Sequence, residues 1–213
     1  TLTMRGTSSF SNASVDSFSN AAGATLILEA EGLGGSASNL TVANGFTNAG
    51  TIILTDNTGV STSSLLTVTT GTLTNTGSIQ FANVNSGVQE IDAILDNQGT
   101  LDVDSENTVR LTNTGRTFTN TGTVDIASGA TFTVNGGTVT QNSAGILTGD
   151  GTLDVSTAAL TSNGIVNPGT VGTAGSLAIT SGVTLGALST LNIDIGGLTA
   201  GSQFDQINIS GAL

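Results

Sequence analysis

The sequence contains no Cys, His, Lys, Trp or Tyr and only a single Pro. The absence of Cys excludes disulfides. The absence of His, Cys and Lys removes the usual general bases, nucleophiles and transition-metal ligands. Only carboxylates are left for catalysis or for binding a metal ion. The composition therefore argues against nucleophilic catalysis and zinc sites, and we expect a protein that is not an enzyme.

Positive charge is equally scarce. Three Arg residues stand against fifteen acidic residues, which gives a net charge of −12. Nucleic acids and anionic membrane surfaces are bound through clusters of Lys and Arg, so we expect neither as a partner. No run of 18 apolar residues is present, and no basic segment followed by an apolar stretch opens the chain. We therefore expect no transmembrane helix, no membrane insertion and no signal peptide in this sequence.

What the chain has in abundance is a short repeated phrase. It consists of a large apolar residue, a small polar residue, Asn, one or two small residues, Gly and a β-prone pair. Clear copies occupy residues 46–52, 73–79, 95–101 and 118–124, and looser copies occupy 18–23, 139–145 and 160–164. The anchoring Gly residues recur every 19 to 27 residues. A period of this length is typical of stacked-repeat architectures.

Between the phrases, apolar and polar residues alternate. In Leu101-Asp102-Val103-Asp104 the apolar side chains can face inward while the carboxylates face outward. Strict alternation over short segments indicates half-buried strands, and no segment has a convincing helical stripe. Short strands at this repeat length predict an all-β fold, a right-handed parallel β-helix (β-solenoid) of about 8–10 coils. Stacking at about 4.8 Å per coil would make a rod of about 40–50 Å.

The phrase itself is expected to form a corner of each coil. Asn tolerates the left-handed backbone that a corner can require, and Gly permits a sharp bend. Stacked Asn amides can also hydrogen-bond from coil to coil. The repeat thus predicts one line of Asn side chains along the rod, formed by Asn48, Asn75, Asn97 and Asn120.

The last fifty residues have a different character, with longer strands separated by Gly turns. Their motifs are Asn163-Gly164-Ile165-Val166-Asn167-Pro168-Gly169, Gly175-Ser176-Leu177, Leu191-Asn192-Ile193-Asp194-Ile195-Gly196-Gly197 and Phe204-Asp205-Gln206-Ile207-Asn208-Ile209-Ser210-Gly211. This combination resembles the C-terminal part of bacterial autotransporter passenger domains, and the repeats resemble those of large surface adhesins. We therefore divide the chain into a repeat array, residues 1–163, and C-terminal coils of passenger type, residues 164–213, within one continuous rod.

The resemblance implies an extracellular β-solenoid at the bacterial cell surface. We expect a structural, non-catalytic segment, an adhesin stalk or passenger, that presents loops such as 29–39 or 83–94 for adhesion. Its partner would be a glycan or protein receptor on a host or neighbouring cell. One alternative is a self-assembling extracellular fibre subunit, because an uncapped solenoid end can add strands from another copy. A second alternative is a polysaccharide-active β-helix enzyme.

Carboxylates are the remaining candidates for chemistry. Asp102, Asp104 and Glu106 form the densest acidic cluster, and Asp125 occupies the same place in the next phrase as Asp102. Glycosidases need two carboxylates on one face, but such a cluster is more often a solvated strand surface. In stacked coils Asp102 and Asp125 would repel each other unless water or a hard cation such as calcium lay between them. The calcium hypothesis therefore names Asp102, Asp104 and Asp125, and no other cofactor is expected.

Overall fold

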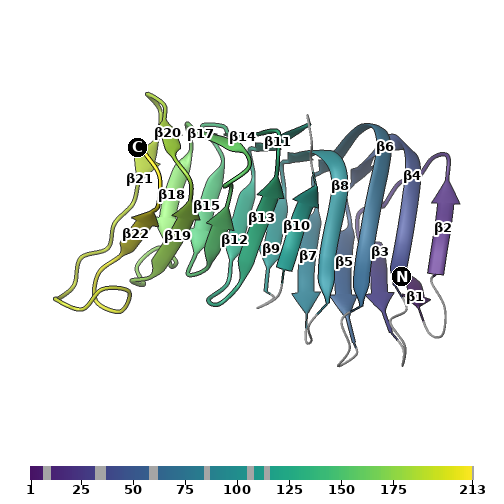
Figure 1. The fold of residues 1–213 in the computed structure, drawn as a ribbon, viewed down its shortest axis with the longest axis horizontal. Coiled ribbons are helices and arrows are strands. Elements are labelled where there is room, and N and C mark those ends of the chain that lie inside the picture. The colour runs from purple at the N-terminus through teal and green to yellow at the C-terminus, as the bar shows by residue number, and fades with distance from the viewer. Residues whose placement is uncertain are drawn as a thin grey trace.

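The computed structural model describes residues 1–6, 11–31, 37–57, 62–83, 87–104, 108–112 and 116–212. These residues form strands and turns, and none of them belongs to a helix that could cross a membrane. The strands stack as parallel rungs along one axis (Figure 1). The chain is therefore an all-β parallel solenoid, as the repeat predicts.

One strand from each winding builds the first sheet, which has nine strands and covers one side of the solenoid. In spatial order they are β1 (Leu2–Gly6), β3 (Thr25–Ala30), β5 (Thr51–Asp56), β7 (Ser78–Asn83), β9 (Thr100–Val103), β12 (Thr123–Ile126), β15 (Ile146–Gly149), β18 (Ile165–Pro168) and β21 (Thr190–Leu191). Every neighbouring pair is parallel and stays in register. The order follows the chain, so each winding adds one rung.

The second sheet has thirteen strands and closes the other two sides of the solenoid. In the first winding β2 (Ser11–Val15) covers the second side. In the next three windings a single strand runs along both sides: β4 (Ser38–Asn48), β6 (Ser63–Asn75) and β8 (Val88–Asn97). In later windings one strand covers the second side and another the third. The second side carries β10 (Thr108–Thr112), β13 (Thr131–Asn135), β16 (Thr152–Asp154), β19 (Ser176–Thr180) and β22 (Gln206–Ile209). The third side carries β11 (Thr117–Asn120), β14 (Thr138–Gln141), β17 (Ala159–Ser162) and β20 (Val183–Leu185).

The second sheet forks at β8. Its first half pairs with β10 and its second half pairs with β11. After the fork, turn residues separate the two sides, as at Gly136 and Gly137, whose φ angles of 77° and 72° end β13. About seven turns are fully formed, slightly fewer than the 8–10 coils predicted. The last winding explains part of the difference, because it contributes only the two-residue β21 and the four-residue β22.

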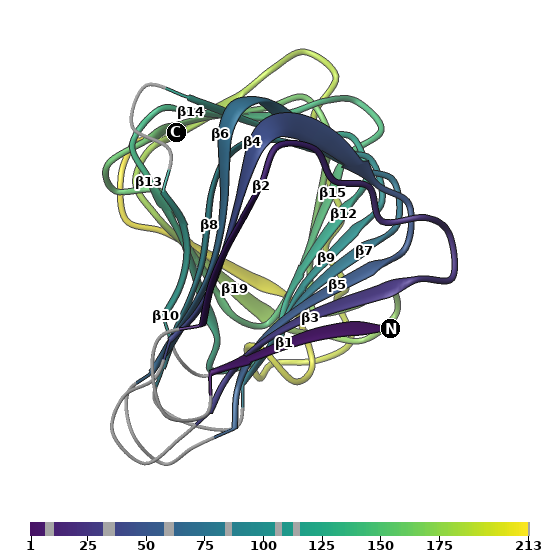
Figure 2. The ribbon, with the colours of Figure 1, turned by 90° about the vertical axis from the view of Figure 1, so that its right-hand side faces the viewer.

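The interior is one continuous apolar cluster that runs the length of the rod. Alternate residues of each strand are buried, as in β9 and β12. One interior column stacks the apolar residue that opens each phrase, and its register partners are Phe46, Leu73, Leu95, Phe118, Val139, Leu160 and Val183. The end-on view in Figure 2 shows the strands of successive windings stacked along each side.

The corner geometry differs from the prediction. None of the four phrase Asn residues has a positive φ, so their left-handed conformation was wrongly predicted. The glycines of the four clear phrases have no positive φ and are needed for space. A Cβ on Gly77 would lie 2.1 Å from the carbonyl oxygen of Gly50, and one on Gly99 would lie 2.0 Å from that of Gly77. Each Gly therefore lets the backbones of adjacent rungs approach closely.

The predicted presenting loops are shorter than expected. Glu29 and Ala30 belong to β3, and residues 88–94 belong to β8. Residues 32–36 and 84–86, at the centres of these loops, lie outside the described residues. The ends of β3, β5 and β7 and the starts of β4, β6 and β8 meet at one corner of the solenoid (Figure 2). The described ends of these six strands therefore mark one corner between the first and second sides.

Candidate functional site

The polar feature that runs furthest through the molecule is a ladder of buried Asn side chains. In each step, Nδ2 of one Asn donates to Oδ1 of the Asn in the next winding, at 2.7 to 2.8 Å. The ladder runs through Asn20, Asn48, Asn75, Asn97 and Asn120, all of which are buried. The four Asn residues that the repeat placed in one line are thus linked by direct hydrogen bonds.

A second hydrogen bond fixes each amide. The same Nδ2 also donates to a backbone carbonyl on the first sheet of the following winding, for example from Asn48 to Ser78 and from Asn75 to Thr100, both at 2.9 Å. Both amide hydrogens are therefore used, and Oδ1 accepts from the winding before. Because an unpaired buried amide is costly, Asn48, Asn75 and Asn97 each depend on the Asn in the winding before and in the winding after.

The column continues beyond the Asn residues with different chemistry. Gln141 occupies the next position and donates to the carbonyl oxygens of Gly145 and Ile165 at 2.9 and 2.6 Å. Ser162 follows and donates to Oε1 of Gln141 at 3.2 Å. The list of four Asn residues therefore omitted Asn20, Gln141 and Ser162. Their signal in the sequence was the looser phrase copies at 18–23, 139–145 and 160–164.

The acidic residues of the calcium hypothesis lie on the outer surface of the first sheet. Asp102 of β9 and Asp125 of β12 are register partners in adjacent rungs, about 4.8 Å apart along the rod. Asp104 is exposed, and its Oδ2 accepts a hydrogen bond of 2.9 Å from Gln80. Glu106 lies outside the described residues.

Burial and neighbouring negative charges make ionisation of Asp102 and Asp125 less favourable. Partial burial, and then the nearby charges of Asp104 and Asp125, raise the pKa of Asp102 above its usual value. Burial also raises the pKa of Asp125, with further contributions from Asp104 and Asp150, against a hydrogen bond from the Ile126 amide. Ionisation of Asp102 and Asp125 therefore costs some stability in the folded protein.

The structure gives the calcium hypothesis little support. Within the described part of the chain, no group of three or more acidic side chains is disposed to hold a metal ion. The physical reason is that alternate residues of a sheet project from one surface, so their carboxylates point outward side by side instead of surrounding an ion. Asp102, Asp104 and Asp125 therefore form an acidic strand surface in which Asp104 is already hydrogen-bonded.

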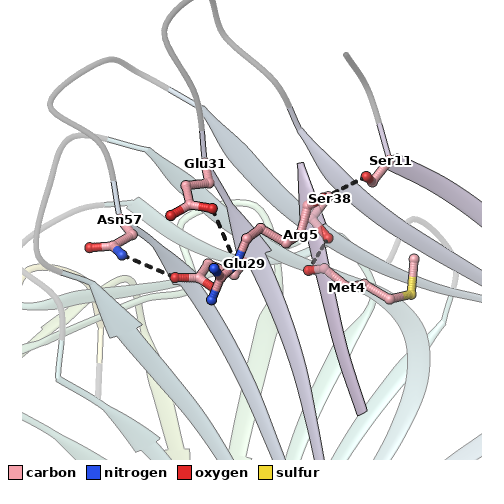
Figure 3. A network of polar contacts seen from close by, with 7 residues as sticks. All are labelled: Met4, Arg5, Ser11, Glu29, Glu31, Ser38 and Asn57. Carbon is pink, nitrogen blue, oxygen red and sulfur yellow. Dashed lines mark hydrogen bonds and ion pairs between the residues drawn. The ribbon is translucent and has the colours of Figure 1, made fainter. Parts of the chain in front are cut away.

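A separate polar network lies at the N-terminal end, where one of the three Arg residues is used (Figure 3). Arg5 pairs with Glu29 of the next winding at 2.7 Å and with Glu31 at 3.1 Å. Asn57 of the third winding donates to the same Glu29 at 3.1 Å. Ser38 donates to the carbonyl oxygen of Met4 at 2.9 Å. These contacts tie the first three windings together.

At the other end, a buried carboxylate holds the final connections. Asp205 accepts hydrogen bonds from the backbone amides of Gly175 and Asp194 at 2.7 and 2.8 Å. Asp194 in turn accepts one from the amide of Gly172 at 2.8 Å. Backbone amides donate all three hydrogen bonds, so the carboxylates of Asp194 and Asp205 join the loops to one another.

Comparisons of the chain with protein-family models, with curated proteins and with solved structures gave no match. The resemblance to autotransporter passenger domains thus rests on the motifs of residues 163–211 alone. The solenoid fold is shown by the structure, while membership of an adhesin family stays a prediction.

Proposed function

We propose that this chain is a structural, non-catalytic segment of a bacterial surface protein, a rigid extracellular spacer that presents loops for adhesion. The observation that carries this proposal is the buried Asn ladder. Five amides in successive windings are joined by direct hydrogen bonds, and each is also bonded to the backbone of the neighbouring rung. Such an interior resists bending and sliding of the rungs without disulfides.

The placement of the other polar groups agrees with a spacer. The carboxylates of Asp102 and Asp125 lie on an outer strand surface, and those of Asp194 and Asp205 bind backbone amides. Eight steps between the nine strands of the first sheet give a rod of about 38 Å at about 4.8 Å per step. The described ends of β3, β5 and β7 lie at one corner of the solenoid, and we place the receptor-binding surface at that corner.

A deletion of one whole winding tests the spacer proposal. Removing residues 50–76 joins Ala49 to Gly77, which preserves an Asn-Ala-Gly corner and the ladder contact from Asn48 to the following Asn. We expect the variant to keep its β-sheet circular dichroism and to shorten by about 4.8 Å in small-angle scattering. Displayed on a non-adherent bacterium, the intact chain should confer adhesion that is lost when the corner loops are replaced by Gly-Ser segments.

The enzyme alternative is separated by a direct assay. Incubation with a panel of acidic and neutral polysaccharides should leave chain length unchanged. Depolymerisation that disappears in an Asp102→Asn variant would instead establish a glycan-degrading activity and contradict the proposal. A deletion variant that unfolds would show that the windings are not modular and would contradict the spacer role.

A further inference from the structure

Three Asn residues of the chain are followed directly by Gly, namely Asn44, Asn135 and Asn163. An Asn-Gly pair is chemically labile, because Gly has no side chain to shield its backbone nitrogen from the side-chain carbonyl carbon of the preceding Asn. The reaction requires these two groups to turn toward each other, and hydrogen bonds or close packing oppose that rotation. The surroundings of each pair therefore decide whether it reacts in the folded protein.

The Asn residues of the ladder do not belong to this class. In the four clear phrases the residue after Asn is Ala, Thr or Gln, and Gly follows one position later. Both amide hydrogens of Asn48, Asn75 and Asn97 are also hydrogen-bonded. The ladder is therefore shielded from this reaction both by its sequence and by its hydrogen bonds.

Asn44 lies within β4, where its side chain and the following Gly are both held in place. Its Nδ2 donates to the backbone carbonyl oxygen and to Oδ1 of Asp16, at 2.9 and 3.2 Å. A Cβ on Gly45 would collide with the backbone nitrogen of Thr72, so this peptide is packed against the next rung. The Gly45 nitrogen cannot turn toward the Asn44 side chain without separating two rungs.

Asn163 follows β17 and is held between two windings. Its backbone nitrogen donates to the carbonyl oxygen of Gln141 at 2.7 Å. A Cβ on Gly164 would collide with the carbonyl oxygen of Gly145 in the winding before. A Cβ on Gly186, in the winding after, would collide with Oδ1 of Asn163. Close packing on both sides therefore restrains this pair as well.

Asn135 lies in different surroundings, at the end of β13. It is half-buried, and its side-chain amide makes no hydrogen bond within the described part of the chain. Gly136 and Gly137 follow with φ angles of 77° and 72°, so the chain enters the turn before β14 directly after Asn135. The two groups that must meet therefore lie where the strand ends.

The reacting nitrogen of this pair is restrained by an exposed side chain. The backbone nitrogen of Gly136 donates to Oγ1 of Thr157 in the next winding, at 3.0 Å. The same hydroxyl donates to the carbonyl oxygen of Val134 at 3.4 Å. Thr157 thus holds the turn from the surface, whereas the other two pairs are held by the packing of the rungs.

We propose that Asn135 is a site of spontaneous deamidation, with the Thr157 hydroxyl as its main restraint. The nitrogen of Gly136 attacks Cγ of Asn135 and loses its proton to solvent, while the side-chain nitrogen takes up a proton and leaves as ammonia. The resulting succinimide adds water at either carbonyl and opens to Asp or to isoaspartate. The net reaction consumes one water and releases one ammonia, so no other reactant is required.

The product changes the turn in two ways. Both products add a negative charge, and isoaspartate also lengthens the backbone by one atom. Gly136 and Gly137 can absorb that atom, because Gly adopts left-handed and right-handed conformations with similar ease. The inference does not depend on the adhesive role, since it concerns the chemistry of one turn.

The test follows the 213-residue protein at mildly alkaline pH by peptide mapping with tandem mass spectrometry. Asn135 should gain one mass unit and accumulate isoaspartate several-fold faster than Asn44 or Asn163. In concentrated urea the three pairs should react at comparable rates, because the rungs no longer restrain them. Asn135→Ser should remove most of the ammonia release from the folded protein. Asn44→Ser is the matched control and should leave that release unchanged.

Variants of Thr157 give the sharpest comparison. Thr157→Val removes the hydroxyl at nearly constant size and should speed the reaction at Asn135 several-fold, whereas Thr157→Ser keeps the hydroxyl and should react like the wild type. A folded protein in which Asn135 stays intact while the unfolded chain reacts would overturn the proposal. So would conversion of Asn44 or Asn163 at the rate of Asn135, or a Thr157→Val variant that reacts no faster than Thr157→Ser.

Discussion

The middle of the rod and its last windings share one repeat but are stabilised by different means. From Asn20 to Asn120 the interior polar column is an unbroken chain of amides. In the following windings the same column holds Gln141, Ser162 and then Leu185, which is exposed. The comparison shows that the ladder is continuous where each winding supplies an Asn at this position, and that it stops where the Gln141 amide donates to backbone carbonyl oxygens.

Different contacts replace the ladder at the C-terminal end. Asp205 and Asp194 bind loop amides there, and Asp150 accepts a hydrogen bond from the Ser176 amide at 2.8 Å. These carboxylates secure irregular connections, whereas the Asn residues secure regular rungs. Variants that act on one region and spare the other should therefore separate the two kinds of stabilisation.

The largest difference is expected between Gly77→Ala and Gly172→Ala. A Cβ on Gly77 would lie 2.1 Å from the Gly50 carbonyl oxygen, a backbone atom that cannot move without separating two rungs. We expect a loss of about 3 kcal/mol or more in the free energy of unfolding. Gly172 has a φ of 82° and open space around it, so its replacement should cost only about 1 kcal/mol. Urea denaturation measures both, and equal losses would contradict the close approach of the rungs.

Removing one amide from the ladder should have the next largest effect. Asn75→Ala leaves Oδ1 of Asn97 and the carbonyl oxygen of Thr100 without their donor, and we expect a loss of about 2–3 kcal/mol. Ser162→Ala, at the other end of the column, removes one donor to Gln141 and should cost about 1 kcal/mol or less. A ladder that merely fills space would tolerate Asn75→Leu as well as the wild-type residue, and that result would contradict this interpretation.

The acidic surface should show a smaller effect, with a defined sign. Because the pKa values of Asp102 and Asp125 are raised in the folded protein, their ionisation opposes folding. The penalty is absent below the unfolded pKa near 3.8 and grows as the pH rises through the raised values. Asp102→Asn with Asp125→Asn should therefore raise stability at pH 7 and make no difference near pH 3. We expect a gain under about 1 kcal/mol, since both groups are partly exposed.

The pKa of Asp154 is shifted in the opposite direction, below its usual value. Burial alone would raise its pKa, but hydrogen bonds from Thr180 and Ser156 outweigh burial and lower it. Asp154→Asn should therefore reduce stability at pH 7, and this loss should shrink as the pH falls below the unfolded value. Melts of the wild type, the Asp102→Asn/Asp125→Asn double variant and Asp154→Asn across pH 3 to 7 check both signs, and parallel curves would contradict the assignment.

Calcium is expected to have the smallest effect of all. Since the acidic surface offers its carboxylates side by side, thermal melts with calcium and with chelator should share one midpoint. A midpoint that rises with calcium in the wild type, but not in Asp102→Asn, would instead restore the metal hypothesis for this surface.

Much of the architecture could be predicted from the sequence, because the repeat sets both the winding length and the inward positions. Alternation in residues 101–104 and the spacing of the phrases were enough to predict a parallel solenoid and one line of Asn residues. The role of the phrase glycines could not be predicted in this way. Their requirement comes from a carbonyl oxygen of the neighbouring rung, at Gly50 for Gly77, and such contacts exist only after the register is set.

The contacts at the N-terminal end and the short strands at the C-terminal end could not be predicted from the sequence either. Ser38 and Arg5 are ordinary residues in a strand pattern, and their contacts join windings more than twenty residues apart. The number of complete turns was overestimated because the C-terminal segments read as full coils, while β21 and β22 are short and separated by a long connection. Local alternation predicts a strand, but it does not predict which strand of the neighbouring winding pairs with it.

Native-state hydrogen exchange tests the central claim most directly, namely that the amide ladder and its flanking columns make the middle of the rod its most stable part. We expect the backbone amides of β5, β7, β9 and β12 to exchange only through global unfolding, and those of β20, β21 and β22 to exchange first. Exchange in β21 and β22 as slow as in β7, or loss of protection beginning in the ladder windings, would contradict the account.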